Sequence, residues 1–166
     1  RQRQMCKETG LYSKSDLVIA GSGSLTVNAN YNNGITGKDT LFIQKASVTV
    51  TAVNHGINGK DSLTIKDADI TVTSGGDALR STNDSDTTLG YLVITGSALK
   101  LTAGEDGIQA ETTLTISGGT TTVTTAGGAG QSISDNTSAK GLKAGTQVTV
   151  TGGILQLLFL YTSDAA

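Results

Sequence analysis

The sequence predicts an all-β fold, a right-handed parallel β-helix built from about six coils of about 22 residues each. Three observations support this prediction. A small residue, usually glycine, recurs along the chain, and two short runs of alternating apolar residues follow it each time. The composition includes 22 glycines and no proline. Glycine suits tight corners, and the absence of proline leaves every strand able to donate its backbone hydrogen bonds.

The repeat is clearest from His55 to Gly76, with the sequence HGINGKDSLTIKDADITVTSGG. Successive opening residues are separated by 24, 22, 22, 29 and 34 residues, and insertions near residues 82–90 and 127–138 account for the two long intervals. No coil of this length buries a core alone, so the coils must stack on one another. The small residues that open the coils are Gly10, Gly34, Gly56, Ala78, Gly107 and Gly141.

Each coil contains two predicted strands, because apolar residues at positions i and i+2 turn one face inward. Six coils with a rise of about 4.8 Å per coil predict a rod of about 24 Å from the first coil to the last. The first strands carry the pairs Leu17/Ile19, Leu41/Ile43, Leu63/Ile65, Leu92/Ile94, Leu114/Ile116 and Val148/Val150. The second strands carry Leu25/Val27, Val48/Val50, Ile70/Val72, Leu99/Leu101, Thr121/Val123 and Leu155.

Composition and charge restrict the class of protein. At 166 residues the chain has room for one domain with its own core. A net charge of −2 argues against general binding of nucleic acid, which needs a basic excess, and we expect neither a membrane-inserted segment nor an oligomer. The single cysteine, Cys6, excludes an intrachain disulfide framework.

The two ends of the chain carry no repeat. The sequences RQRQMC and LLFLYTSDAA resemble translated library-adapter sequence, so we place residues 1–8 and 156–166 outside the β-helix domain of residues 9–155. The alternative is that Ile154 to Tyr161 is a last strand that closes the stack. Because a solenoid normally has terminal caps and neither end offers one, we expect a fragment of a longer protein.

Carboxylates collect at one corner of the predicted coils. The residues before the opening positions are Thr9, Asn33, His55, Asp77, Asp106 and Lys140, and asparagine or aspartate there suits a turn with positive φ. Asp77 and Asp106 lie on consecutive coils about 4.8 Å apart, where their charges repel unless a cation lies between them. Together with Glu105 they predict a calcium site. His55 has no second histidine or thiol beside it, so we interpret it as a turn residue and expect no zinc.

The insertion that begins at Thr82 predicts a second calcium site. Asp84 and Asp86 alternate along the sequence TNDSDT and can direct both carboxylates at one ion. Glu111 is the aligned residue on the next coil and would complete the site. The spacing does not fit an EF-hand, and a polar loop without an ion is the alternative.

Lysine and threonine form two further sets on the outward faces. Lys14, Lys38 and Lys60 fall in one column, which composition favours as a solvated edge that limits aggregation, with a basic stripe for an anionic polymer as the alternative. The outward strand positions are rich in threonine, which is ordinary in strands. A flat Thr-x-Thr array also occurs in ice-binding solenoids, although Lys100 interrupts it here.

The aligned coils resemble a family of secreted bacterial carbohydrate-binding β-helices. The matching stretches are NNGITGKDTLFI, HGINGKDSLTI, DALRSTNDSDTTLGYLVITGSAL, EDGIQAETTLTISGG and SAKGLKAG, which cover about residues 10–153. Among these stretches, DALRSTNDSD and EDGIQAET are the ones that are specific to the family. The resemblance implies bound calcium, cellulose or polygalacturonate as ligand, kinship with family-nine pectate lyases, and a location outside the bacterial cell or on its surface. His55 and Asn33 depart from the aspartates that many repeats carry at these positions.

Together with what the resemblance implies, these features lead us to expect a non-catalytic, calcium-stabilised module that binds plant cell-wall polysaccharide, namely pectin, cellulose or both. Its cations would pair with uronate carboxylates and its tyrosines would offer stacking faces. A calcium-dependent polyuronate lyase is the first alternative and needs a base near C5 of the sugar, but the sequence marks no desolvated lysine or arginine. A structural stalk and an ice-binding solenoid are the others. The residues expected to contact the polymer are Tyr12, Lys38, Lys60, Arg80, Tyr91 and Lys143.

Overall fold

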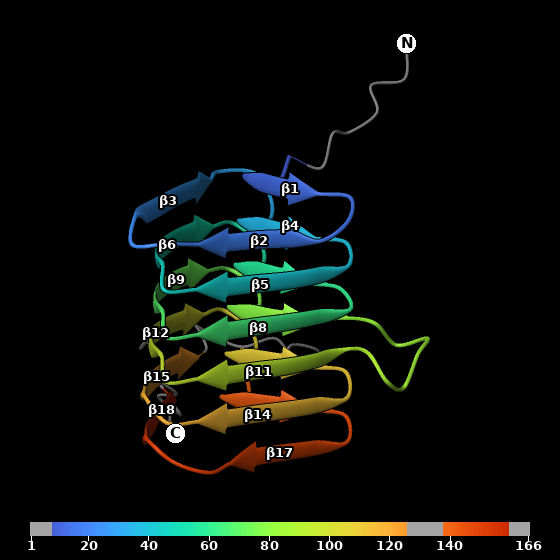
Figure 1. The fold of residues 1–166 in the computed structure, drawn as a ribbon, viewed down its shortest axis with the longest axis vertical. Coiled ribbons are helices and arrows are strands. Elements are labelled where there is room, and N and C mark those ends of the chain that lie inside the picture. Colours follow the sequence, from blue (N-terminus) through green and yellow to red (C-terminus); the bar gives the residue numbers. More distant parts are fainter. Residues whose placement is uncertain (1–7, 126–137, 160–166) are drawn as a thin grey trace, which may run out of the picture.

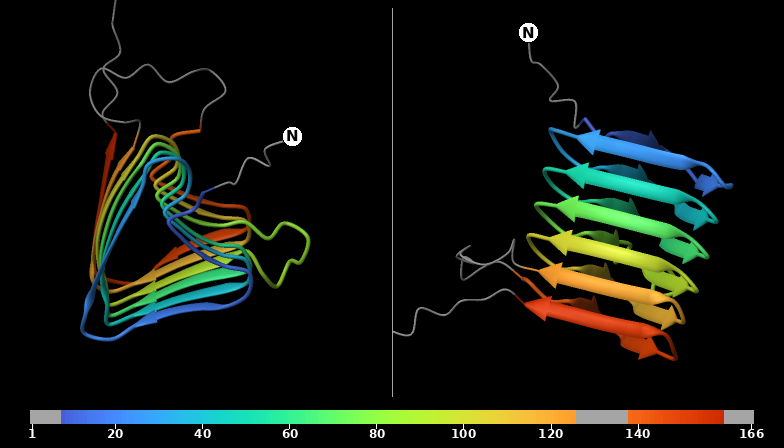
Figure 2. Two further views of the ribbon diagram at one scale, coloured as in Figure 1. Left: turned by 90° about the horizontal axis from the view of Figure 1, so that it is seen from above. Right: turned by 90° about the vertical axis from the view of Figure 1, so that its left-hand side faces the viewer.

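The computed structural model describes residues 8–125 and 138–159, which form a solenoid of six coils (Figure 1). Each coil contributes one strand to each of three parallel six-stranded sheets. Seen from the N-terminal end, the chain runs clockwise and away from the viewer, which is the right-handed sense (Figure 2). The predicted parallel β-helix is confirmed. No helix in these two ranges is long and apolar enough to cross a membrane.

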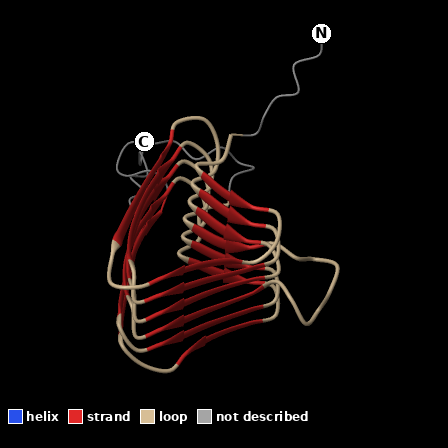
Figure 3. Ribbon diagram, turned by 45° about the horizontal axis from the view of Figure 1, so that its top comes forward, coloured by secondary structure: helices blue, strands red, loops and turns tan. Residues whose placement is uncertain are grey.

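The three sheets form the three walls of the solenoid (Figure 3). The first sheet consists of β1 (Leu11–Ser13), β4 (Ile35–Gly37), β7 (Ile57–Gly59), β10 (Leu79–Ser81), β13 (Ile108–Ala110) and β16 (Leu142–Ala144). The second consists of β2 (Leu17–Ala20), β5 (Thr40–Gln44), β8 (Ser62–Lys66), β11 (Tyr91–Thr95), β14 (Thr113–Ser117) and β17 (Gln147–Val150). The third consists of β3 (Ser24–Ala29), β6 (Ser47–Ala52), β9 (Asp69–Ser74), β12 (Ala98–Ala103), β15 (Thr120–Thr125) and β18 (Ile154–Phe159).

Each coil therefore has three strands, where the sequence predicted two. The missed strands are those of the first sheet, which are only three residues long. Each presents one large apolar residue inward and ends on a serine, glycine or alanine, so the alternation that marks a strand has almost no length in which to repeat. We number the coils 1 to 6 by their first-sheet strands, from β1 to β16.

The core contains the inward pairs that the sequence predicted, together with the inward apolar residues of the first sheet. In coils 2 to 5 these side chains are almost completely buried, and Leu41, Leu63, Leu92 and Leu114 lie directly above one another in the second sheet. Burying one such side chain stabilises a fold by about 1.5 to 3 kcal/mol. In coil 6, Val148 and Val150 occupy the same inward column but are 43% and 45% exposed, because no further coil covers them in the described residues.

In four of the six coils, a valine in the same coil requires the opening residue to be glycine. A Cβ atom at Gly34 would clash with Cγ1 of Val50, and the same clash recurs in coils 1, 3 and 5. Coil 4 has Ala78 instead, and its residue in register with Val50 is Leu101. Leucine branches at Cγ rather than at Cβ, which leaves room for the alanine methyl group, and both side chains are buried.

The insertion in coil 4 leaves the register of the strands intact. It projects from the corner after β10 and is the loop that extends from the solenoid in Figure 1. The N–H of Gly90 then donates to the carbonyl of Asp61 at 2.7 Å, and the N–H of Thr112 donates to the carbonyl of Gly90 at 3.0 Å. Gly90 therefore returns the chain to its place between coils 3 and 5.

The C-terminal boundary of the solenoid differs from the predicted one. Strand β18 pairs with β15 through Phe159, so the last coil extends beyond residue 155. This agrees with the alternative in which the apolar tail is a last strand. Residues 1–7, 126–137 and 160–166 lie outside the described residues, and with them most of the second insertion and of the two ends that resemble adapter sequence.

Candidate functional site

A ladder of hydrogen bonds runs along the corner that precedes the first sheet. In each step, a side-chain acceptor on one coil accepts the backbone N–H of the equivalent residue on the next coil. We call the five residues the corner ladder. The steps are Asn33 Oδ1 to His55 N (3.2 Å), His55 Nδ1 to Asp77 N (2.9 Å), Asp77 Oδ1 to Asp106 N (3.0 Å) and Asp106 Oδ1 to Lys140 N (2.8 Å).

This role replaces the one that the sequence suggested for these positions. We expected asparagine and aspartate here to support turns with positive φ. In the described ranges, the residues other than glycine with positive φ are Lys45 and Asp67, at a different corner. The corner ladder instead needs side chains that accept a hydrogen bond, because each of these buried or partly buried backbone N–H groups requires an acceptor.

His55 is a neutral member of the corner ladder. Burial, and then the charge of Arg80, lowers the pKa of His55 to about 4. Its Nδ1 accepts the N–H of Asp77, so the ring proton belongs on Nε2. The 3.4 Å separation between Nδ1 and Asp77 Oδ2 is therefore not an ion pair at neutral pH. His55 lies in the corner between β6 and β7, as expected for a turn residue, but it is bonded to Asn33 and Asp77 rather than isolated.

Asp77 is a buried carboxylate whose negative charge is only partly compensated by its neighbours. Burial raises its pKa to about 6; the hydrogen bond from Asp106 N and the charge of Arg80 lower it, while the charges of Asp106 and Glu105 raise it further. Its Oδ2 lies 3.8 Å from Arg80 Nη1, which is long for a hydrogen bond. One oxygen of Asp77 thus serves the corner ladder and the other remains available.

Asp106 is fully engaged by its own neighbours. Its Oδ1 accepts from the hydroxyl of Ser138 at 2.7 Å as well as from Lys140 N, and its Oδ2 lies 3.1 Å from Lys143 Nζ. Burial alone would raise the pKa of Asp106, but these hydrogen bonds and the charge of Lys143 outweigh burial and lower it. Asp106 therefore has no oxygen left over, and the predicted Asp77–Asp106 pair does not converge.

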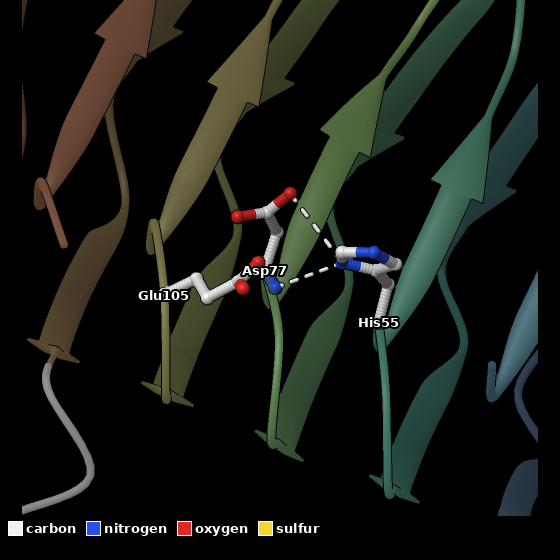
Figure 4. A group of neighbouring side chains, drawn as sticks. All are labelled: His55, Asp77 and Glu105. Carbon is white, nitrogen blue, oxygen red and sulfur yellow. Dashed lines mark hydrogen bonds and ion pairs between the residues drawn. The ribbon is translucent and has the colours of Figure 1, made fainter. Parts of the chain in front are cut away.

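The structure brings a different set of ligand atoms together. His55, Asp77 and Glu105 come from three consecutive coils and lie side by side (Figure 4). Their ligand atoms fall within 4.8 Å of one another, and in residues 8–125 and 138–159 no other group of three acids, histidines or cysteines does so. His55 Nδ1 has already used its lone pair. Asp77 Oδ2 and the Glu105 carboxylate remain, and this oxygen donor set fits a hard cation such as calcium rather than zinc.

The insertion does not bring together the three acids predicted for the second site. The carboxylates of Asp84, Asp86 and Glu111 do not come within 4.8 Å of one another. Asn83, which is buried, folds the loop instead: its Oδ1 accepts from Ser85 N, Ser85 Oγ and Asp86 N, and its Nδ2 donates to Asp61 Oδ1 at 2.6 Å. Asp86 accepts from the backbone and hydroxyl of Thr88, which lowers its pKa.

Beside the corner ladder, the outward positions of the first sheet form a column of polar side chains. We call it the polar column. Its buried atoms Thr36 Oγ1, Asn58 Oδ1 and Arg80 Nε have no hydrogen-bond partner among the described residues. Burial lowers the pKa of Arg80, against the opposing charges of Asp77, Glu105 and Glu111. In register, the polar column consists of Tyr12, Thr36, Asn58, Arg80, Gln109 and Lys143.

Three of the six residues predicted to contact the polymer share this column: Tyr12, Arg80 and Lys143. Lys38 and Lys60 are exposed at the corner that follows the first sheet, just beyond Gly37 and Gly59. Tyr91 is the first residue of β11, on the second sheet, and does not join them. Sequence reasoning missed Thr36, Asn58 and Asn83, although the alignment of coils already placed the first two in the column of Arg80.

The fold and this corner define a parallel β-helix that carries a column of polar side chains beside a cluster of buried acids. The sequence matches the family described as carbohydrate-binding domain-containing protein over residues 2–166, and the chain belongs to this family.

Two known proteins are similar to this chain. A carbohydrate-binding domain-containing protein of Acetivibrio thermocellus is 47% identical over 106 residues, which are 64% of this chain and 37% of that protein. The solved structure of a polysaccharide lyase-like protein from C. thermocellum, in a gadolinium derivative, is 32% identical with a TM-score of 0.80 over 95% of this chain and 58% of that one. The chain spans less than two thirds of the length of either.

Proposed function

We propose that the chain is a non-catalytic module that binds acidic plant cell-wall polysaccharide along the polar column, outside the bacterial cell, with calcium held by Asp77 and Glu105. The observation that carries the proposal is Arg80, whose buried Nε has no hydrogen-bond partner among the described residues and lies in the middle of a column of polar side chains. Membership of a carbohydrate-binding family supports a polysaccharide as the ligand.

The cations of the polar column suit a uronate polymer that runs along the solenoid axis. A guanidinium presents a planar fork of donors that matches a carboxylate, and its hydrogen bonds to charged acceptors are stronger than neutral ones. Lys143 follows two coils later in the same column, at a distance of about 10 Å for two coil rises. Two carboxylates on one polymer can therefore be held at once. Tyr12, which is 47% exposed, offers a ring face at the N-terminal end.

Calcium would neutralise Glu105 and the oxygen of Asp77 that the corner ladder does not use. Asp77 Oδ2 and Glu105 supply oxygen ligands, which hard cations prefer. The similar polysaccharide lyase-like protein was solved as a gadolinium derivative, and gadolinium is also a hard cation. Asp84, Asp86 and Glu111 remain a second, weaker proposal, because the loop would have to move to bring them together.

A lyase is the second candidate, because the solved relative is described as polysaccharide lyase-like. Lyase chemistry needs a neutral base beside the sugar. Lys143 Nζ is engaged by Asp106 Oδ2 at 3.1 Å, and the Nδ1 lone pair of neutral His55 is occupied by the N–H of Asp77. Neither group is free to take a proton from a polymer on the polar column, so binding is favoured over cleavage.

Calorimetric titration with polygalacturonate tests the binding proposal. Each charge-assisted hydrogen bond contributes about 1.5 to 3 kcal/mol, so Arg80→Gln or Lys143→Gln should weaken binding about tenfold or more. Lys66→Gln is the matched control, because Lys66 is an exposed lysine on β8 whose loss changes the net charge equally. Unchanged affinity in both variants would exclude the polar column. Product with ultraviolet absorption from unsaturated ends would identify a lyase instead.

Thermal melting with calcium and with chelator tests the metal. An ion that binds only the folded chain adds about 2.7 kcal/mol at a concentration of 100 times its Kd, so the melting midpoint should rise. Glu105→Gln should abolish the rise, while Asp106→Asn should retain it because Asp106 is already paired with Lys143. A rise that survives Glu105→Gln would place the ion elsewhere.

A further inference from the structure

A hollow on the outward face of the third sheet lies apart from the polar column. It has a volume of about 390 Å³ and spans three consecutive coils over β9, β12 and β15. The right-hand view of Figure 2 looks onto this sheet. The side chains around it that matter here are Asp69, Thr71, Ala98, Lys100, Thr120 and Thr122.

The hollow arises from the sequence of coil 4. Ala98 lies in register between Asp69 and Thr120, and its methyl group is smaller than either neighbour, so it leaves a dip in the column. In the adjacent outward column, Lys100 lies between Thr71 and Thr122. Strand β12 thus has a smaller side chain than its neighbours at Ala98 and a longer, cationic side chain at Lys100. Elsewhere this face is mainly serine and threonine.

The groups around the hollow are unengaged. In the part of the chain that the structure describes, no hydrogen bond or ion pair involves the side chains of Asp69, Thr71 or Lys100. Asp69 and Lys100 do not pair with each other, although both are exposed and they flank the hollow diagonally. Ile70 and Leu99 also border the hollow, but their side chains point into the core and are 1% and 3% exposed. The methyl group of Ala98 therefore forms the apolar base of the hollow, with Asp69 as an acceptor and Lys100 as a donor at its rim.

This arrangement fits a neutral pyranose ring. The ring can lay its C–H face on the apolar base, while its hydroxyls donate to Asp69 and accept from Lys100 and threonine. A uronate fits less well, because its carboxylate would meet the Asp69 carboxylate within the same small space. Ice is also a poor fit, because the hollow and Lys100 interrupt the flat threonine array.

We propose that this hollow is a second carbohydrate site, which binds a neutral pyranose unit of a polysaccharide with Asp69 and Lys100 as the polar contacts. It lies on a different sheet from Arg80 and Lys143 and does not depend on calcium or on the polar column. The module would then hold an acidic polymer on its first sheet and a neutral polymer on its third.

Titration with soluble neutral oligosaccharides tests this proposal. The probes are the pentasaccharides of β-1,4-glucan, β-1,4-xylan and β-1,4-mannan, with oligogalacturonate as the acidic comparison. Ala98→Ile fills the hollow and should weaken binding of the preferred neutral probe tenfold or more, with oligogalacturonate binding unchanged. Isoleucine is compatible with this column, because Ile154 occupies it in coil 6. Ser47→Ile is the matched control, since it adds the same bulk to the same face outside the hollow.

Amide chemical shifts measured by NMR give a second readout that does not require a variant to fold. The preferred neutral probe should shift the amides of residues 69–71, 98–100 and 120–122, and Asp69→Asn should reduce its affinity. Binding of no neutral probe at millimolar concentration would overturn the proposal, as would equal affinity in Ala98→Ile and wild type. Loss of oligogalacturonate binding in Ala98→Ile would overturn the assignment to a neutral sugar. Arg80→Gln should leave the affinity for the neutral probe unchanged. The proposal for the hollow and the proposal for the polar column can therefore be refuted independently.

Discussion

The corner ladder performs one task with two kinds of residue. In coils 2 and 3 the acceptors are neutral, Asn33 and His55, and in coils 4 and 5 they are the carboxylates Asp77 and Asp106. All four accept the same backbone N–H at the same place in the coil. Because a neutral acceptor is sufficient for this task, the charge of the two aspartates has to be explained by something other than the backbone.

The two carboxylates differ in how their charge is balanced. Lys143 lies 3.1 Å from Asp106, and the pKa of Asp106 is lowered. Arg80 lies 3.8 Å from Asp77, and the pKa of Asp77 is raised to about 6. Asp106, whose charge is neutralised by its neighbours, acts as a structural acceptor. Asp77, whose charge is only partly compensated, is where a bound cation or ligand would gain the most electrostatic stabilisation.

The largest expected effect is on stability, when an acceptor is removed from the charged half of the corner ladder and the loss is compared with that from the neutral half. Asp106→Ala leaves Lys140 N–H, the Ser138 hydroxyl and the Lys143 ammonium without their partner, and should lower the free energy of unfolding by about 3 to 4 kcal/mol. Asn33→Ala leaves one N–H and should cost about 1 kcal/mol.

Urea unfolding followed by circular dichroism measures both losses. Asp106→Asn is the control, because it keeps an acceptor and removes only the charge, and its loss should fall between those of the two alanine variants. Equal losses for Asp106→Ala and Asn33→Ala would show that the charged half of the corner ladder contributes no more than the neutral half.

The next effect is a pair of opposed pH dependences. In the unfolded chain aspartate titrates near 3.9 and histidine near 6.5. Folded Asp77 titrates at about 6, so from pH 4 to 6 the native state holds the extra proton and stability falls as pH rises. Folded His55 titrates at about 4, so from pH 4 to 6.5 the unfolded state holds the extra proton and stability rises with pH. The two contributions nearly cancel in the wild type.

Single variants should separate these contributions. His55→Asn keeps an acceptor and removes the His55 contribution, so the Asp77 contribution is no longer cancelled and stability should fall by about 2 to 3 kcal/mol from pH 4 to 6. Asp77→Asn leaves only the His55 contribution, so stability should rise by a similar amount. Unfolding free energies measured at half-unit steps of pH would show two lines of opposite slope. Parallel profiles would mean that these two groups do not titrate as the geometry requires.

The smallest effect concerns the insertion, whose acids lie outside the corner ladder. Asn83→Ala removes the buried side chain that holds the loop to Asp61 and should cost about 1 to 2 kcal/mol. Asp84→Asn should change stability by less than about 0.5 kcal/mol, because Asp84 is exposed. Thermal melting compares the two variants. A larger loss for Asp84→Asn would mean that an ion does bind in the loop.

The fold was largely predictable because its signal repeats. Pairs such as Leu63/Ile65 and Ile70/Val72 mark inward positions by their spacing, and the recurrence of a small residue fixed the length of the coil. Ala78 fitted the series although it is not glycine. The strands of the first sheet were missed because three residues are too few to show a period of two.

The site was less predictable than the fold. Alignment of the coils placed His55, Asp77 and Asp106 in one column, but it did not indicate where each side chain points. That direction is set by the hydrogen bond that each side chain accepts from the backbone N–H of the following coil. The position of this N–H is known only from the three-dimensional structure. Asp84 and Asp86 looked like ligands, yet the loop folds onto Asp61 through Asn83 and not toward Glu111.

The return of the chain at Gly90 has a consequence for engineering. Because Gly90 bonds to coil 3 and coil 5 as an uninterrupted coil would, the residues between Asn83 and Gly90 can change in length or sequence without moving a strand. Foreign peptides grafted at this corner would be displayed beside the solenoid at a fixed height on its axis. The corresponding corners of the other coils lie at successive steps of about 4.8 Å, so the solenoid can serve as a molecular ruler that sets the separation between two grafted peptides.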